Sequence, residues 1–229
     1  MNDYWKEFWT RQARSSTSEP SQCQVLRTLQ RNPIGEMQFK DILEDIDRKM
    51  SVRRKDHVLD LCCGNGLITA HLAQQCARIV GVDFAEDLTK RIDLDNYPNL
   101  SVVVEDIRKV QFPPESFNKT IIYAGIQYLT LGEAVTLFEE VFKWTCRDGM
   151  LLVGDIPDNS RLWEFSNSAE RRAAYFESMK NGAPIIGTWF DPLWLKYLGE
   201  HVGFRQADCL AQPPHLPYSH YRFDAIFRK

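Results

Sequence analysis

Residues 58–66 read Val58-Leu59-Asp60-Leu61-Cys62-Cys63-Gly64-Asn65-Gly66, an apolar run that stops in a Gly-x-Gly turn. Such a run is typical of a buried strand, and the apolar positions of residues 67–76 behind it have helical spacing. A second apolar run, residues 79–82, leads directly into Asp83. Strand, glycine turn, helix, strand and carboxylate, in this order, predict a site for a ligand that contains a nucleoside.

Each part of this arrangement has a physical reason. Gly64 and Gly66 let the main chain pass close to a ligand, because a Cβ atom there would collide with it. The N–H groups of the turn and of the helix start face the same ligand. Asp83, at the end of the second strand, can accept the protons of both ribose hydroxyls.

A nicotinamide dinucleotide is the first competing ligand. Its fingerprint is G-x-G-x-x-G or G-x-G-x-x-A directly after the strand. Gly64 and Gly66 fit this pattern, but the third position is Thr69. A pyrophosphate needs close packing of the helix at that third position, so Thr69 counts against NAD.

The segment resembles the first motif of class I S-adenosylmethionine-dependent methyltransferases, with Cys62 where many members have glycine. The likeness continues in register and covers roughly residues 55–156. The other segments that carry it are Asp83-Phe84 and the apolar strands of residues 102–107, 117–123 and 149–155. This resemblance implies S-adenosyl-L-methionine as cofactor and S-adenosyl-L-homocysteine as product, without a metal ion.

The resemblance also implies roles for individual residues. Asp60 would stand near the methionine end of the cofactor, Phe84 against the adenine, and Asp106 would accept from the adenine amino group beside the N–H of Ile107. The cofactor-binding residues expected on this basis are Asp60, Cys62, Gly64, Gly66, Asp83, Phe84, Asp106, Ile107 and Tyr123. Capping of a turn by Asp60, a solvated Asp83 and helix capping by Asp106 are the alternatives.

Strands that alternate with helices predict an α/β fold with a doubly wound sheet. The apolar spacing predicts helices over residues 36–49, 132–146 and 191–202, and an alternating final strand over 221–227. The resemblance implies seven strands in the order 3-2-1-4-5-7-6, with the last strand antiparallel.

Two segments do not belong to that sheet, and both are rich in aromatic residues. We expect residues 1–50 to form an N-terminal helical cap, with an aromatic helix over residues 2–12. Residues 51–229 would form the methyltransferase domain, with 156–190 as a substrate-side insertion after strand 5. Ligands of open α/β sheets bind beyond the carboxyl ends of the strands, and the insertion begins there, at the end of strand five. We expect both segments to cover the cofactor and to form a substrate pocket.

Substrate contacts are expected from these segments and from the end of strand four. Trp9 of the cap and Trp163 of the insertion are candidates, with ordinary packing as the alternative. By resemblance, Gln127 and Tyr128 bind the acceptor. Tyr218 is a further candidate, because the loop 211–220 follows a strand that ends on the ligand side.

The same loop holds two histidines, His215 and His220. Histidine titrates near neutrality and suits a general base for a hydroxyl acceptor. Asp155, at the end of strand five, either orients such a histidine or acts alone. The predicted catalytic residues are therefore His215, His220 and Asp155, with solvated loop histidines as the alternative.

Composition and net charge restrict the classes of partner and the compartment that we expect. The 229 residues carry a net charge of −3, and the absence of a basic field disfavours nucleic acid as a partner. Six cysteines without a C-x-x-C pair, and an opening Met1-Asn2-Asp3-Tyr4 without a secretory pattern, favour a cytoplasmic protein. No apolar run is long enough for a membrane span, and no Cys/His cluster has zinc spacing.

These observations predict S-adenosylmethionine-dependent methyl transfer to a hydroxyl or amine of a small polar metabolite or sugar. Residues 22–27 and the insertion resemble bacterial small-molecule or sugar methyltransferases. The alternatives are an RNA or protein methyltransferase on the same fold, and a non-catalytic cofactor-binding protein.

Overall fold

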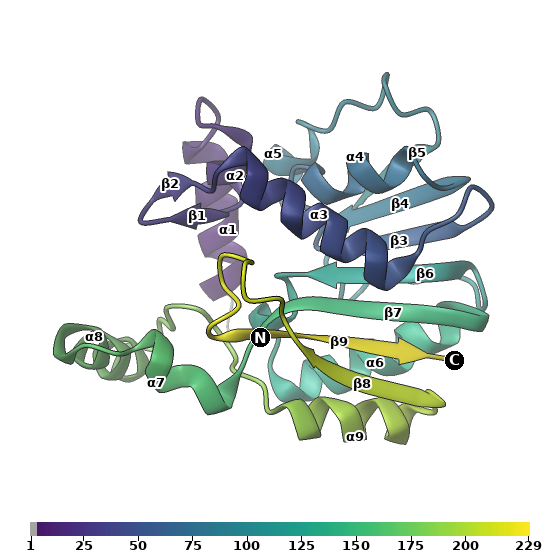
Figure 1. The fold of residues 1–229 in the computed structure, drawn as a ribbon. Coiled ribbons are helices and arrows are strands. Elements are labelled where there is room, and N and C mark those ends of the chain that lie inside the picture. The colour runs from purple at the N-terminus through teal and green to yellow at the C-terminus, as the bar shows by residue number, and fades with distance from the viewer. Residues whose placement is uncertain (1–3) are drawn as a thin grey trace.

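The computed structural model describes residues 4–229 and shows a seven-stranded sheet between helices (Figure 1). Residues 1–3, the start of the predicted cap, lie outside the described residues. The strands of the sheet are β3 (His57–Leu61), β4 (Arg78–Asp83), β5 (Leu100–Val104), β6 (Phe117–Tyr123), β7 (Thr145–Pro157), β8 (Gln206–Ala211) and β9 (Arg222–Arg228).

The strand order is β5-β4-β3-β6-β7-β9-β8. Strands β3 to β7 pair in parallel, whereas β9 is antiparallel to both of its neighbours, β7 and β8. In chain order this is 3-2-1-4-5-7-6 with the last strand antiparallel, so the predicted topology is confirmed.

Helices cover both faces of the sheet. The helical segments are α1 (Tyr4–Ser15), α2 (Ser21–Gln24), α3 (Glu36–Met50), α4 (Leu67–Ala73), α5 (Glu86–Thr89), η1 (Ile126–Tyr128), α6 (Leu131–Trp144), η2 (Asn159–Arg161), α7 (Leu162–Phe165), α8 (Ala169–Lys180) and α9 (Pro192–Val202). The hairpin of β1 (Thr28–Leu29) and β2 (Asn32–Pro33) lies between α2 and α3 and was not predicted.

Local sequence explains where α9 begins and ends. The Asp191 side chain accepts hydrogen bonds from the N–H groups of Leu193 (2.7 Å) and Trp194 (3.2 Å), and Pro192 occupies the first turn. Gly203 ends the helix with a left-handed φ of 114°. The predicted helix over 191–202 is confirmed on these grounds.

The core has two layers, because successive strand residues point to opposite faces of the sheet. Val58, Ile121 and Leu152 pack with α3 and α4 on one face. Their neighbours Leu59, Ile122 and Leu151 pack with α6 and α9 on the other. Helix α3, which the sequence assigned to the cap, therefore belongs to the core: its Ile42, Ile46 and Met50 are 1% exposed or less.

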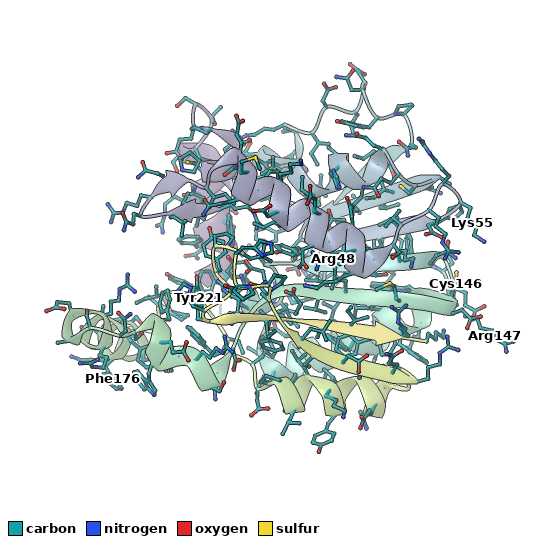
Figure 2. The ribbon with its side chains drawn as sticks, viewed as in Figure 1. Arg48, Lys55, Cys146, Arg147, Phe176 and Tyr221 are labelled. Atoms are coloured by element: carbon teal, nitrogen blue, oxygen red, sulfur yellow. The ribbon has the colours of Figure 1, made fainter. Side chains whose placement is uncertain are left out.

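The remaining elements gather at one end of the sheet. Figure 1 shows α1, the β1–β2 hairpin and α7–α8 at the left, where the arrows of the parallel strands point. Helix α8 has no buried residue, and its Phe176 is 60% exposed at the outer end of the molecule (Figure 2). Within residues 4–229, none of the helices combines the length and apolar character that a membrane crossing requires.

Candidate functional site

A cavity opens beyond the carboxyl ends of β3, β4, β6 and β7. We call its two parts the cofactor half and the acceptor half. The cofactor half is lined by Asp60, Cys62, Cys63, Gly64, Asn65, Asp83, Phe84 and Leu88. The acceptor half is lined by Arg27, Thr28, Tyr123, Ala124, Gln127, Tyr128, Asp155, Tyr218, Tyr221 and Arg222, and Trp9 of α1 adjoins both.

Asp83 fixes the shape of the glycine turn. Its Oδ2 accepts the N–H of Gly64 at 2.9 Å, and its Oδ1 accepts the N–H of Ala85 at 2.8 Å. Gly64 and Gly66 have φ angles of 56° and 80°, which favour glycine. Burial raises the pKa of Asp83, although the two N–H donors oppose this. Gly66 begins α4 and does not itself line the cavity.

Asp60 lies at the end of β3, almost fully buried. Burial raises the pKa of its carboxyl to about 7; a hydrogen bond from Thr69 opposes the shift, and the charge of Asp83 adds to it. The Thr69 hydroxyl donates to Asp60 Oδ2 at 2.6 Å. Thr69, at the third position of the dinucleotide fingerprint, therefore has a different role here: its hydroxyl binds the Asp60 carboxylate.

Cys62 lines the cavity with a left-handed φ of 64°. Its Cβ lies in the space beside Gly125, where an added Cβ would come within 2.7 Å. Burial, with Asp83 and Asp60 nearby, raises the pKa of the Cys62 thiol well above its usual value. The thiol therefore stays protonated and has no nucleophilic role.

Asp106 and Ile107 stand apart from the cavity lining. They line a separate hollow with Arg108 and Glu133. The Asp106 carboxylate accepts from the backbone N–H of Arg108 at 3.1 Å and from its Nε at 2.7 Å. Burial disfavours the charge of Asp106, but the Arg108 donors outweigh burial and hold its pKa below the usual value. Its charge also acts on Asp83 and Cys62 of the cofactor half, and its bond to an adenine stays a prediction.

The cap closes over the cofactor half. Trp9, Val25 and Phe84 pack on a small apolar cluster formed with Leu88. Trp9 also meets the ring of Tyr128 edge to face, with 5.5 Å between ring centroids. Helix α1 therefore bridges the two halves of the cavity as a lid, and the buried Trp9 Nε1 has no hydrogen-bond partner.

Gln127 and Tyr128 are positioned by the insertion. The backbone N–H of Thr188 donates to the Gln127 carbonyl at 2.8 Å, and the Thr188 hydroxyl donates to the Leu129 carbonyl at 2.6 Å. The Gln127 side chain donates to the Ala124 carbonyl at 2.7 Å, while its buried Oε1 has no partner. The insertion thus supports this wall, although residues 156–190 do not line the cavity themselves.

Asp155 reaches the cavity through an irregularity in the sheet. The register between β7 and β9 shifts between Val153 and Ile156, and Asp155 has a φ of 59°. Its N–H donates to Asp224 Oδ1 at 2.7 Å, and its carbonyl accepts from Arg222 Nη1 at 2.6 Å. These two residues of β9 hold the main chain of Asp155, and Gln212 Nε2 donates to its carboxylate at 3.4 Å.

The structure does not bring His215, His220 or Trp163 to the cavity. Both histidines are exposed and neither lines it. The ring of His220 packs on Tyr221, with 4.7 Å between centroids. Trp163 is 50% exposed and packs on Tyr175 of α8. From the predicted loop, Tyr218 alone reaches the cavity, and its hydroxyl donates to the Thr28 carbonyl at 2.9 Å.

Comparisons with known proteins agree with this geometry. Residues 58–149 match the model of a methyltransferase domain family. They span the glycine turn, Asp83 and the walls at Gln127 and Tyr128. Over residues 58–149 the chain is therefore similar to a methyltransferase domain.

Relatives of this methyltransferase domain differ in what they act on. The chain is 29% identical to a malonyl-[acyl-carrier protein] O-methyltransferase of Bacillus anthracis over 69% of its length and 58% of that protein. It is 33% identical to an rRNA adenine N-6-methyltransferase of Lysinibacillus sphaericus over 38% of its length and 35% of that protein. The chain spans about a third to three fifths of the length of the curated relatives it matches.

A solved structure extends the likeness to the whole fold. It is phosphoethanolamine N-methyltransferase 1 of Haemonchus contortus, in complex with phosphoethanolamine and S-adenosylhomocysteine. The TM-score is 0.71 at 14% identity, and the match covers 99% of this chain and 48% of that one. The fold is therefore shared with that structure over nearly the whole of this chain.

Two arginines of the site were not predicted. Arg27 and Arg222 are each 8% exposed, and both line the acceptor half. The Arg27 guanidinium lies 5.1 Å from the centre of the Tyr123 ring, and that of Arg222 lies 5.0 Å from the Tyr221 ring. Arg222 lies on the face of the predicted final strand opposite to the alternating apolar residues, so the apolar pattern did not indicate it.

The side chains that line the cofactor half suit the parts of S-adenosylmethionine. The half-buried carboxylate of Asp83 at the end of β4 suits ribose hydroxyls, and Phe84 and Leu88 offer apolar surface to an adenine. The carboxylate of Asp60 suits a cationic group. Among residues 4–229, no group of three Asp, Glu, His or Cys side chains is arranged to hold a metal ion.

We expect Gly154→Ala to destabilise the methyltransferase domain. A Cβ at this position would lie 2.4 and 2.6 Å from two atoms of the Tyr123 ring, the ring under Arg27. Overpacking of this kind costs about 1–3 kcal/mol, and urea unfolding would measure it. Gly132→Ala in α6 is the control: nothing lies within 4 Å of its added Cβ, so it should be neutral or stabilising. Equal unfolding free energies for the two variants would contradict this reading of Tyr123.

Proposed function

We propose that this chain transfers a methyl group from S-adenosylmethionine to a hydroxyl or amine of a small polar molecule. The observation that carries the proposal is one cavity that runs from Asp83 to Asp155 under the lid of Trp9. The bound donor supplies an activated methyl group on a sulfonium. The residues of the chain need to bind the two substrates, align them, exclude water and accept a proton.

The cofactor half would hold the donor through three side chains. Asp83 accepts from the ribose hydroxyls while it keeps the glycine turn in shape through Gly64. Phe84 packs on the adenine, and Asp60 faces the methionine end. Cys62 and Tyr123 line the space where the methyl group would be presented.

The acceptor half would align the nucleophile. Gln127 and Tyr128, whose loop Thr188 supports, contact the acceptor, and Tyr218 closes the opposite side. The lone pair of the acceptor oxygen or nitrogen forms the new bond to the methyl carbon. The electrons of the broken carbon–sulfur bond go to sulfur, and the proton of the acceptor passes to the Asp155 carboxylate.

Asp155 is the base we propose, because the other polar groups on this side keep their protons. Burial raises the pKa of Tyr128 to about 12 and also raises the pKa of Tyr218 and Tyr221. His215 and His220 are exposed outside the cavity. Asp155→Asn should therefore depress turnover while leaving the affinity for S-adenosylhomocysteine nearly unchanged.

The lid over the cavity supports a small acceptor. Trp5 and Trp9 of α1 both pack on Tyr128, with centroid distances of 4.8 and 5.5 Å. An RNA or protein segment would have to displace this lid to reach Asp155. We propose that residues 4–35, the part of the predicted cap (residues 1–50) that precedes the core helix α3, supply this lid, and that residues 156–190 support the acceptor wall.

Transfer of labelled methyl groups tests the proposal. The protein is incubated with methyl-labelled S-adenosylmethionine and, separately, a filtrate of small metabolites, total RNA and a protein extract. We expect label in the metabolite products. Label in RNA or protein instead would favour the alternative acceptors. Tight binding of S-adenosylhomocysteine with no transfer to any pool would favour a non-catalytic binding protein.

Donor affinity should depend on pH through Asp60. Its pKa in the free protein is about 7, and a neighbouring sulfonium favours the ionised form, so binding lowers this pKa. Affinity is then fully developed above pH 7 and falls as the pH decreases below it, by at most about tenfold per pH unit. S-Adenosylhomocysteine lacks the sulfonium charge and should show a weaker dependence.

Calorimetry on both ligands at about pH 6 and about pH 8 measures this difference. Asp60→Asn is the control, since an amide does not titrate and the dependence should disappear. Equal pH dependence for the charged donor and the neutral product would show that Asp60 does not interact with the sulfonium.

A further inference from the structure

The acceptor half contains more positive charge than its own residues balance. Its charged lining residues are Arg27, Arg222 and Asp155, so two guanidinium groups face one carboxylate. The arginines come from different walls: Arg27 precedes the β1–β2 hairpin of the cap, and Arg222 begins β9. Both are more than nine-tenths buried, where an unmatched charge is costly.

Both arginines also have donors without acceptors. Arg27 Nη1 and Arg222 Nε are buried and make no hydrogen bond among the residues 4–229. Arg222 uses Nη1 for the Asp155 carbonyl, at 2.6 Å. Buried polar atoms in native proteins are almost always paired, so these two donors indicate a ligand that supplies acceptors.

The surroundings keep the two guanidinium groups in place. Arg27 lies over the Tyr123 ring and Arg222 over the Tyr221 ring. A guanidinium that rests on a ring still has its edge free, and that edge matches the oxygens of a carboxylate, phosphate or phosphonate. The nearby buried cation Lys49 is already matched, because Asp45 and Asp224 both bind it.

We propose that the methyl acceptor carries an anionic oxygen group, which Arg222 and Arg27 bind from opposite sides of the acceptor half. This inference rests on the proposed function and names its substrate class. The anion holds one end of the acceptor between the two arginines. The hydroxyl or amine at the other end then lies between Asp155 and the methyl group.

A first experiment uses inorganic phosphate and acetate as probes. Each is titrated by calorimetry into protein loaded with S-adenosylhomocysteine. We expect saturable binding, weakened about tenfold or more by Arg222→Gln and by Arg27→Gln, because each removes a charged hydrogen bond. Arg172→Gln, on the exposed surface of α8, is the matched control and should leave the affinity unchanged.

The same variants distinguish binding of an acceptor anion from binding of the carboxylate of the donor itself. In Arg222→Gln and Arg27→Gln, the affinity for S-adenosylhomocysteine should stay within about twofold of the original. A variant that loses this affinity and keeps phosphate binding would assign its arginine to the donor and overturn its role here. If the free protein fails to bind S-adenosylhomocysteine at all, the proposed function fails instead.

A second experiment does not depend on the folding of any variant. Products of the labelled transfer from the metabolite filtrate are separated on an anion exchanger near neutral pH. We expect the label in the retained, anionic fractions. Label only in the unretained neutral and cationic fractions, or no binding of either probe to the loaded protein, would overturn the proposal.

Discussion

Asp83→Ala is expected to weaken the binding of S-adenosylhomocysteine by about a hundredfold or more. The carboxylate accepts the N–H groups of Gly64 and Ala85, so its removal loosens the glycine turn. It would also remove the acceptor for the ribose hydroxyls. Hydrogen bonds to a charged group contribute about 1.5–3 kcal/mol each, and two or more are lost together.

Two further variants test whether the loss of affinity comes from the Asp83 carboxylate. Asp83→Asn retains one carbonyl oxygen and should fall between Ala and the original protein. Asp87→Ala removes a carboxylate nearby that makes only an exposed ion pair with Arg14, and should have no effect. Isothermal calorimetry gives the affinities, and urea unfolding checks that each variant is folded. Unchanged affinity in Asp83→Ala would exclude Asp83 from the ribose.

The cofactor half was predictable because its signals are local. A strand that ends in Gly64, and a second strand that ends in Asp83, are read from neighbouring residues. The parallel sheet then brings the two strand ends together, as β3 pairs with β4 from His57↔Arg78 to Leu61↔Val82. Hydrophobic period and chain order predicted the alternation of strands and helices, whereas the strand order came from the resemblance to class I methyltransferases.

The acceptor half depended on contacts that no local pattern encodes. The prediction correctly placed the loop 211–220 at the ligand side, but side-chain direction in an irregular loop follows no period. Tyr218 points into the cavity, whereas His215 and His220 are exposed. Asp106 is likewise predicted to contact the adenine. No sequence pattern indicates that Arg108, two residues later, binds the Asp106 carboxylate.

The burial of Arg222 and Asp224 follows from the predicted strand order. Tyr221, Phe223, Ala225 and Phe227 alternate along the predicted final strand, with Arg222 and Asp224 between them. In the confirmed order that strand lies between β7 and β8, so both of its edges are paired, and its residues 222–227 are buried on both faces of the sheet. Charged residues at 222 and 224 are therefore buried, and buried charges in a sheet next to a ligand site deserve a functional interpretation.

Asp224→Ala is expected to lower the free energy of unfolding by about 3–5 kcal/mol. Asp224 is 1% exposed and accepts from three donors: Lys49 Nζ, Gln212 Nε2 at 2.9 Å and the Asp155 N–H at 2.7 Å. Its removal leaves these donors unpaired and Lys49 with Asp45 alone as a buried counter-charge. Urea unfolding measures the change.

Asp208→Ala on the adjacent strand β8 is the matched control, because Asp208 is exposed and its loss should change stability by no more than about 0.5 kcal/mol. Asp224→Asn should be intermediate, since its amide oxygen can still accept the Asp155 N–H but carries no charge for Lys49. A change below about 1 kcal/mol in Asp224→Ala would show that the three donors find other partners.

The same variant separates stability from positioning. Asp224 holds the Asp155 main chain at its left-handed φ of 59°, in the bulge that carries the proposed base to the acceptor. In Asp224→Asn, which retains an acceptor for that N–H, turnover should be largely preserved at temperatures where the protein is folded. In Asp224→Ala, turnover should fall while the affinity for S-adenosylhomocysteine is maintained, because Asp83 ends β4 and the glycine turn follows β3, and β6 and β7 separate both strands from β9. Equal turnover in the two folded variants would mean that the bulge keeps Asp155 in place without Asp224.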